Sequence, residues 1–249
     1  MSAARLTAVD VSKAFNGLAA IESVSFTVDA RELVAVLGPS GAGKTTLFRC
    51  LTGLSAPDRG SIRIDDDDIA TLRGRNRRRV AVVFQQFNLV NRLTAFENVL
   101  AGRLGHVPAW RGWLRRFERA DRLLALECLD RVGLLDRAQQ RADTLSSGQQ
   151  QRVAIARALA QKPRLIVADE PVASLDPAAA TGVLDLLRDI ARSEGVGVVC
   201  SLHQVALARS HTDRIVGLAH GRVVIDAPTD RFDDAAFDSV YGSAVRVPA

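Results

Sequence analysis

Residues 38–45 read GPSGAGKT and place glycines, a lysine and a threonine where a triphosphate could bind. They match the pattern G-x-x-x-x-G-K-[ST], with an apolar run before and a helix-forming run after, which an unrelated glycine-rich turn would lack. The glycines let backbone N–H groups point at phosphate oxygens, and Lys44 adds a charge for the β- and γ-phosphates. The predicted nucleotide-binding residues are Gly38, Pro39, Ser40, Gly41, Ala42, Gly43, Lys44, Thr45 and Thr46.

A buried strand, LIVADE at residues 165–170, is expected to deliver two carboxylates to the same place. In an open α/β sheet, ligands bind outside the carboxyl ends of the strands. The Thr45 hydroxyl and the Asp169 carboxylate suit Mg²⁺, and Glu170 can polarise an attacking water. Acidic residues are common at strand ends, so the pair indicates this chemistry only together with the phosphate loop.

Two further apolar strands end in polar residues, RVAVVF before Gln85 and VGVVCSL before His203. His203 could hydrogen-bond a γ-phosphate, and Gln85 could touch the metal or a water. A single His or Gln at a strand end is usually structural, but four strand ends here point to one crevice. The predicted catalytic residues are Lys44, Gln85, Glu170 and His203, and the predicted metal ligands are Thr45, Gln85 and Asp169.

A second anion-binding feature is expected at residues 144–160, TLSSGQQQRVAIARALA. A Ser-Ser-Gly turn precedes a helix-forming run, and a helix start presents unpaired N–H groups and a positive dipole end. Ser146 can donate its hydroxyl, and Gly148 permits close approach of the backbone. The alternative is an ordinary serine-capped helix, which would be preferred if this stretch stood alone.

The chain has 249 residues and a formal net charge of +5, carried almost entirely by arginine. This charge suits nucleic acid or a membrane surface, or reflects arginines spread over a solvated surface. The short run RGRNRRR at residues 73–79 is expected to be a solvated loop or helix end. Three separated cysteines argue against disulfides or zinc, so we expect a reducing, cytosolic environment, with any membrane attachment made through partners.

Strand-like and helical runs alternate along the chain, which predicts an α/β fold with a largely parallel sheet. We expect antiparallel strands in the N-terminal segment, up to Ala30, and a final strand pair near positions 214–226. The four aspartates at positions 65–68 are expected to form a solvated turn. Positions 92–142 should be mostly helical, including the amphipathic stretch 120–133 that stops at Gly133.

Residues 109–119 combine aromatic and basic side chains. Trp110, Trp113 and Phe117 fall at helical i, i+3, i+7 spacing among Arg111, Arg115, Arg116 and Arg119. Such a basic aromatic helix could dock a membrane subunit near the lipid surface. It could equally form a small local core under a loop. Both interpretations stay open from the sequence.

These motifs occur in an order that resembles the ATP-binding subunits of ABC transporters. The resemblance implies a P-loop NTPase core of the ABC type with an antiparallel β subdomain and a helical subdomain at about 90–160, in one domain covering 5–245. It also implies a head-to-tail homodimer, in which the signature of one copy closes on the ATP and Mg²⁺ of the other. The implied signature residues are Ser146, Ser147, Gly148 and Gln149.

Three further positions are interpreted through the same resemblance. Asp176, in Ser174-Leu175-Asp176, matches a loop that crosses the dimer interface. Phe15 falls where the family places an aromatic residue against adenine, although a strand residue could equally be core. Ser147 departs from the usual glycine, and a Cβ would disfavour a positive φ there, which puts the tightness of closure in doubt.

A narrower resemblance to phosphonate-importer ATPases lies in residues 83–117. It implies two permease subunits, a periplasmic or extracellular substrate-binding protein and a place at the cytoplasmic face of the inner membrane. Another cargo, such as phosphate, an amino acid or an exported substrate, would leave the ATP site unchanged. A nucleic-acid-associated ABC ATPase is a further alternative, but long coiled-coil insertions and a second ATPase half are missing from this sequence, and no specific nucleic-acid partner is expected.

Overall fold

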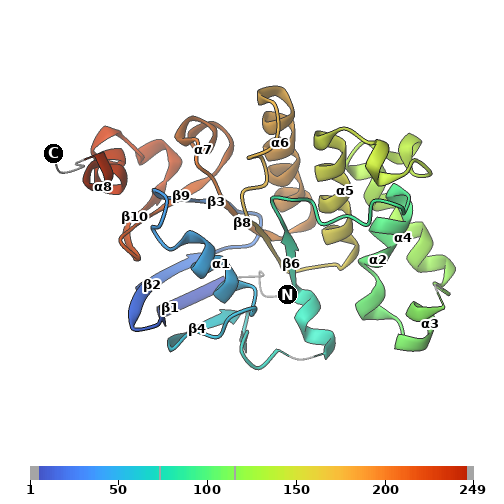
Figure 1. Cartoon of the computed structure of the whole chain (residues 1–249), viewed down its shortest axis with the longest axis horizontal. Helices are drawn as coiled ribbons and strands as arrows, with labels where there is room; N and C mark the ends of the chain where they lie inside the picture. Colours follow the sequence, from blue (N-terminus) through green and yellow to red (C-terminus); the bar gives the residue numbers. More distant parts are fainter. Residues whose placement is uncertain (1–5, 73, 115, 246–249) are drawn as a thin grey trace.

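The computed structural model describes residues 6–72, 74–114 and 116–245. Arg73 and Arg115, which belong to the two basic segments, lie outside the described residues. A six-stranded sheet in the order β10-β9-β3-β8-β7-β6 forms the centre of the protein (Figure 1). Its strands are β3 (Leu33–Leu37), β6 (Val80–Val83), β7 (Leu165–Ala168), β8 (Gly197–Ser201), β9 (Arg214–Ala219) and β10 (Arg222–Pro228).

The pairs β3–β8, β3–β9, β6–β7 and β7–β8 are parallel, so their carboxyl ends share one edge. The expected α/β class is therefore confirmed. β10 pairs antiparallel with β9 and adds an antiparallel edge beyond the one expected from the N-terminal segment. Parallel strands buried on both faces read as continuous apolar runs, which explains why these strands could be located from the sequence.

A separate four-stranded antiparallel sheet has the order β2-β1-β4-β5. Its strands are β1 (Leu6–Phe15), β2 (Leu18–Val28), β4 (Arg59–Ile64) and β5 (Asp67–Asp68). The solvated turn expected at positions 65–68 is therefore only half right. Asp67 and Asp68 pair with Ile64 and Arg63, and the Asp67 carboxylate accepts a hydrogen bond from Arg79. Consecutive aspartates disfavour a strand by composition, but the ladder and the arginine stabilise one here.

Eight α-helices occur in the described part of the chain. They are α1 (Lys44–Leu51), α2 (Ala95–Ala101), α3 (Ala109–Trp113), α4 (Arg119–Arg131), α5 (Ser147–Ala160), α6 (Pro177–Glu194), α7 (Val205–His211) and α8 (Asp234–Val245). Short 3-10 turns occupy Gly74–Arg79 (η1), Leu104–His106 (η2), Leu135–Arg137 (η3), Ala142–Thr144 (η4) and Thr229–Arg231 (η5). Positions 92–142 are mostly helical, as expected. The sequence analysis did not anticipate α8, which covers Gly217 of β9 with Val240.

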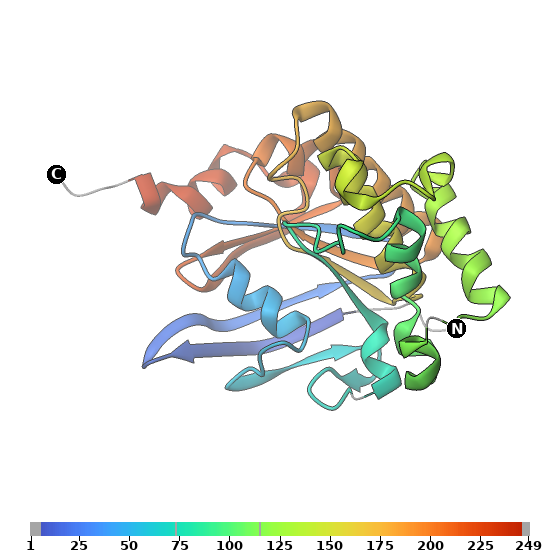
Figure 2. The same ribbon diagram turned by 45° about the vertical axis from the view of Figure 1, so that its right-hand side comes forward.

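The six-stranded sheet separates two hydrophobic clusters. Val34 and Val36 of β3 pack with α1 and the four-stranded sheet, so α1 lies between the two sheets (Figure 2). Leu33, Ala35 and Leu37 face the opposite cluster, which contains buried residues of α2, α4, α5 and α6. The alternation along β3 therefore places α1 and α5 on opposite faces of one sheet.

The three cysteines are reduced and buried in these clusters. Burial raises the pKa of Cys128 to about 11 and that of Cys200 to about 12, and it also raises the pKa of Cys50. Because the thiolate is the reactive form, shielded thiols with raised pKa values are inert near neutral pH.

We therefore expect the native protein to resist a thiol-labelling reagent at pH 8, and to release three reactive thiols after unfolding in guanidinium. Labelling stoichiometry measured by mass spectrometry checks this. Rapid modification of any of the three in the native protein would contradict the burial described here.

Candidate functional site

The phosphate loop connects β3 to α1 and is held in shape by its glycines. Gly43, the N-cap of α1, has φ 102°, and Gly41 has φ 80°. A Cβ on Gly43 would lie 2.4 Å from the carbonyl oxygen of Ala20, and one on Gly38 would lie 2.4 Å from that of Leu218. The backbones of β2 and β9 therefore lie in close contact with the loop, and only glycine fits at positions 38 and 43.

The Lys44 side chain is folded against this loop. Its Nζ donates hydrogen bonds to the carbonyl oxygens of Gly38 at 2.6 Å and Pro39 at 3.0 Å, and the residue is only 7% exposed. Burial lowers the pKa of Lys44, while the charges of Glu170 and Asp169 act to raise it. The charges of both carboxylates therefore act on the ammonium group of Lys44.

A buried serine organises the two carboxylates. The Ser201 hydroxyl donates to Asp169 Oδ1 at 2.9 Å and accepts from the backbone N–H of Glu170 at 2.7 Å. Glu170 has φ 48°, a left-handed conformation that is costly for a non-glycine residue. Because β7 and β8 are adjacent and parallel, the last residue of β8 reaches the turn that follows β7. Ser201 belongs to no motif, so its role could not be predicted from the sequence.

Two of the predicted catalytic residues are in direct contact. His203 Nε2 lies 2.5 Å from Glu170 Oε1, and both side chains are accessible to solvent. Gln85 lies in the turn after β6, and β6 pairs with β7 so that Val83 is opposite Ala168. Gln85 is therefore at the same edge of the sheet as Glu170, although it is exposed and no hydrogen bond joins the two.

The predicted metal ligands Thr45 and Asp169 line one cavity of about 160 Å³, at the start of α1 and the end of β7. A hydroxyl and a carboxylate are oxygen donors of the type that Mg²⁺ prefers, and Mg²⁺ commonly retains several waters in addition. Thr45 and Asp169 are therefore an oxygen pair that suits Mg²⁺, whereas Gln85 follows the neighbouring strand and does not line this cavity.

The segment after Gln85 is held by the helix that carries the signature. Phe87 and Asn88 have φ 43° and 49°, two consecutive left-handed residues. The Arg157 guanidinium of α5 donates to their carbonyl oxygens, at 2.9 Å to Phe87 and 2.5 Å to Asn88. Burial lowers the pKa of Arg157. This contact could not be predicted from the sequence, because an arginine within a helical run gives no signal of a distant partner.

The signature residues begin α5. Ser146 is the N-cap and forms a capping box with Gln149, so its hydroxyl accepts from the Gln149 N–H. Ser147 is the first residue of the helix and is not among the residues with positive φ, so the expected backbone conflict at its Cβ is wrong. A Cβ on Gly148 would lie 3.1 Å from that of Ala179, so this glycine permits close packing against the start of α6.

The remaining predicted binding residues, Asp176 and Phe15, lie at the ends of their elements. Asp176 caps α6 by accepting from the Ala179 N–H at 2.9 Å, in an exposed position. Phe15 ends β1, is 46% exposed and has Lys13 Nζ 5.7 Å from its ring centroid. The core interpretation of Phe15 is therefore wrong, and its ring can stack on a ligand.

A model of the ABC transporter family matches residues 21–173 of this sequence. The chain belongs to that family. It is 51% identical over 96% of its length to a hypophosphite import ATP-binding protein of Stutzerimonas stutzeri, covering 70% of that protein. It is 49% identical over 92% of its length to a phosphonates import ATP-binding protein of Rhodopseudomonas palustris, covering 90% of that protein.

Solved structures of other ABC proteins share the fold. The dimeric post-hydrolysis structure of an ATP-binding cassette bound to ADP and phosphate is 34% identical, with a TM-score of 0.75 over 90% of this chain and 98% of the other. As an ABC ATPase, the chain binds and hydrolyses ATP. In the part of the chain that the structure describes, no helix has the length and apolar content needed to cross a bilayer.

Replacing Ser201 by alanine removes the hydroxyl that joins Asp169 to Glu170. We expect Ser201→Ala to lower the free energy of unfolding by about 1–3 kcal/mol, because the Glu170 N–H loses its acceptor. We also expect kcat for ATP hydrolysis to fall roughly tenfold to a hundredfold through misplacement of the carboxylates. Ser210→Ala, which removes a hydroxyl that bonds only within α7, is the matched control. Lost stability with unchanged kcat would restrict Ser201 to a structural role.

Proposed function

We propose that this chain is the ATP-hydrolysing subunit of an importer for phosphonates, working as a head-to-tail homodimer. The single observation that carries the ATPase assignment is the convergence of Lys44, Asp169, Glu170 and His203 on one sheet edge in an ABC family member. We further propose that residues 5–245 form one ABC ATPase domain, with its helical subdomain at about 90–160.

Each residue of the proposed site has a role that follows from its position. Lys44 and the N–H groups of the loop bind the β- and γ-phosphates, and Phe15 stacks on adenine. Thr45, Asp169 and Gln85 would hold Mg²⁺, which when bound would neutralise the charge of these phosphates. Glu170 accepts a proton from the water that attacks the γ-phosphorus, and the bond to ADP breaks. His203 orients Glu170 and donates to the γ-phosphate.

A second copy of the chain completes this site. The signature end of α5 is accessible to another molecule, because Ser146 and Ser147 are exposed. Its exposed serines and dipole favour negative charge. The dimeric assembly of the 34% identical cassette supports this proposal. Asp176, beside the signature through Ala179 and Gly148, would lie at the same interface.

The proposed general base and the dimer can be tested together. Glu170→Gln should bind ATP and Mg²⁺, lose at least roughly a hundredfold in kcat, and accumulate as a dimer with two nucleotides. Light scattering and bound-nucleotide counting check this. Glu127→Gln, at an exposed position of α4, is the control. Undiminished turnover would remove Glu170 from the base role.

The signature is probed in the Glu170→Gln background by Ser147→Glu. A glutamate at the start of α5 interacts favourably with the helix dipole, so the helix should persist. Its negative charge should repel the γ-phosphate of the ATP bound to the other copy of the chain. We expect ATP binding without dimerisation. The matched control Ser147→Gln should dimerise. A dimer that survives in Ser147→Glu would place the nucleotide elsewhere.

The proposed cargo follows from the relatives. Two similar proteins are named for import of phosphonates and of hypophosphite, both oxyanions of phosphorus. Further similar proteins, from Nitratidesulfovibrio vulgaris and Frankia casuarinae among others, are also named for phosphonates. We therefore propose phosphonate as the cargo and hypophosphite as the second candidate. The system would include two permease subunits and a substrate-binding protein, with this chain peripheral at the cytoplasmic face of the membrane.

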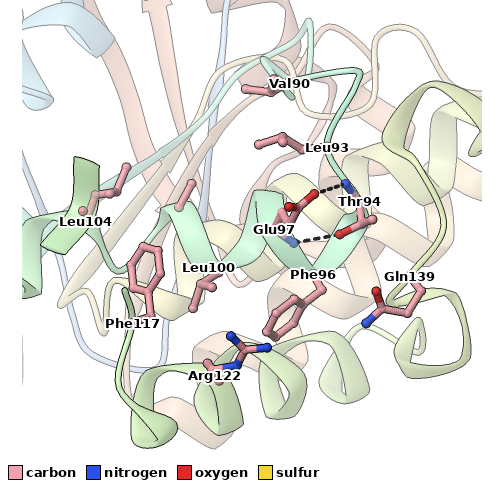
Figure 3. A pocket seen from close by; sticks show the side chains of 12 residues that line it. Val90, Leu93, Thr94, Phe96, Glu97, Leu100, Leu104, Phe117, Arg122 and Gln139 are labelled. Carbon is pink, nitrogen blue, oxygen red and sulfur yellow. Dashed lines mark hydrogen bonds between the residues drawn. The ribbon is translucent and has the colours of Figure 1, made fainter. Parts of the chain in front are cut away.

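A groove in the helical part offers a place for the permease. It has a volume of about 590 Å³ and is lined by apolar side chains of α2 and its neighbours, including Phe96, Leu100 and Phe117 (Figure 3). Glu97 and Arg122 add one charge of each sign to its wall. Grooves of this composition accept an amphipathic helix. We infer that a cytoplasmic segment of the permease binds here.

Deleting the encoding gene should abolish growth on a phosphonate as the only phosphorus source and spare growth on phosphate. Complementation with the intact gene should restore growth, and the Glu170→Gln gene should not. Parallel cultures on hypophosphite separate the two cargoes. A deletion strain that fails to grow on hypophosphite but still grows on the phosphonate would favour hypophosphite as the cargo.

A further inference from the structure

Four exposed apolar side chains of the helical part lie on or beside α3. Trp113 is 87% exposed and Trp110 is 55% exposed, and Leu104 and Leu114 are about half exposed. Leu104 lies over α3, since a Cβ on Gly112 would be 2.9 Å from its Cδ2. The two tryptophans and two leucines are called the α3 surface below. Their exposure shows that the expectation of a small local core is wrong for both tryptophans.

The three aromatic residues at helical spacing, Trp110, Trp113 and Phe117, do not share one helix. α3 ends at Trp113, so Phe117 is not on the same helix as the two tryptophans. Phe117 is instead partly buried against the core and lines the groove of Figure 3. Of the three aromatic residues in this segment, Phe117 faces the groove, whereas Trp110 and Trp113 face solvent.

The α3 surface is bordered by positive charge. Arg116 and Arg119 are exposed, and within the described residues neither forms an ion pair with an acidic side chain. Arg111 pairs with Glu118 and stacks on Trp110, with its Cζ 5.3 Å from the ring centroid.

A second basic segment packs against the turn that precedes α3. The η1 turn, Gly74–Arg79, packs against η2, and a Cβ on Gly105 would lie 3.0 Å from the Cδ of Arg78. Leu104 of the α3 surface belongs to the same η2 turn. The η2 turn therefore contacts both this second basic segment and, through Leu104, the helix α3.

We propose that the α3 surface binds the anionic headgroup region of a lipid bilayer. Tryptophan rings favour the boundary between water and hydrocarbon, and exposed arginines are attracted to anionic lipids. A protein partner usually binds through side chains that enter a pocket. In this protein the concave site for such contacts is the groove, and the two tryptophans lie outside it. A short segment with two tryptophans and a few arginines binds lipid weakly and reversibly. Such binding would orient a subunit that its permease holds, and it goes beyond the proposed function.

The protein carries its own probe for this contact. Trp110 and Trp113 are the only tryptophans of the chain, so its intrinsic tryptophan fluorescence reports on the α3 surface alone. The purified full-length chain is mixed with anionic vesicles, made from one part phosphatidylglycerol and two parts phosphatidylethanolamine, or with pure phosphatidylcholine. We expect emission to shift to shorter wavelength, and lipids brominated near the headgroup to quench it, only with the anionic vesicles.

Two double variants and one control complete the test. Arg116→Gln with Arg119→Gln should weaken binding roughly 30-fold at low salt, because each arginine near an anionic surface contributes about a fivefold gain in affinity. Trp110→Ser with Trp113→Ser should fail to float with the vesicles. Val224→Ser, which removes an exposed apolar side chain from β10, should bind as the unmodified chain does. Raising the salt concentration should weaken binding by screening.

Other outcomes would overturn the proposal. One is no shift and no flotation with anionic vesicles; another is flotation that survives loss of both tryptophans. A shift that occurs only with the permease in phosphatidylcholine discs would assign the α3 surface to a protein contact instead. Vesicle binding needs neither ATP turnover nor cargo, so its failure is distinguishable from failure of the proposed function.

Discussion

The site depends on one hydroxyl that joins two neighbouring strands. Ser201 uses its donor on Asp169 and its acceptor capacity on the N–H of Glu170, so the turn after β7 is fixed by the end of β8. This bond supports the left-handed backbone of Glu170, whose carboxylate contacts His203. The arrangement requires β7 and β8 to be parallel and adjacent, because only then do their carboxyl ends coincide. The continuous apolar strands of the sheet thus determine where the carboxylates lie.

The α5 helix connects the two halves of the proposed site. Its first turn carries the signature, and further along the helix Arg157 holds the strained segment that follows Gln85. At the end of the same helix, the carbonyl oxygen of Ala160 accepts from Arg103, which also pairs with Asp121 of α4. A movement of α5 would therefore displace both the signature and the segment that follows Gln85. Through Arg157, closure of the proposed dimer could alter the position of the segment that follows Gln85.

The parts of the site that depend on local pattern could be predicted from the sequence. The phosphate loop has fixed spacing, and Asp169 and Glu170 follow a strand that is apolar throughout. Ser201 and Arg157 were missed because their partners are 31 and 69 positions away in the chain and meet them only after the sheet and helices pack. The doubt about Ser147 assumed a positive φ, whereas the residue begins a helix where a Cβ is tolerated. Asp67 and Asp68 form a strand through their partners, against their own propensity.

The segment 104–119 shows why spacing alone does not decide between core and surface. An i, i+3, i+7 pattern places three aromatic side chains on one face only if a single helix spans them. Here the helix ends at Trp113, and the chain turns before Phe117, which then packs inward. The same break leaves both tryptophans exposed, with Arg111 stacked on Trp110.

The position of Phe117 in the groove wall shows where the two tryptophans lie relative to the groove. Phe117 and Leu104 both line the groove, and Leu104 also lies over α3, so the groove and the α3 surface are adjacent. A permease segment in the groove would thus lie beside the α3 surface. Because the permease already holds the subunit there, even a weak attraction between these side chains and lipid headgroups would suffice to orient it.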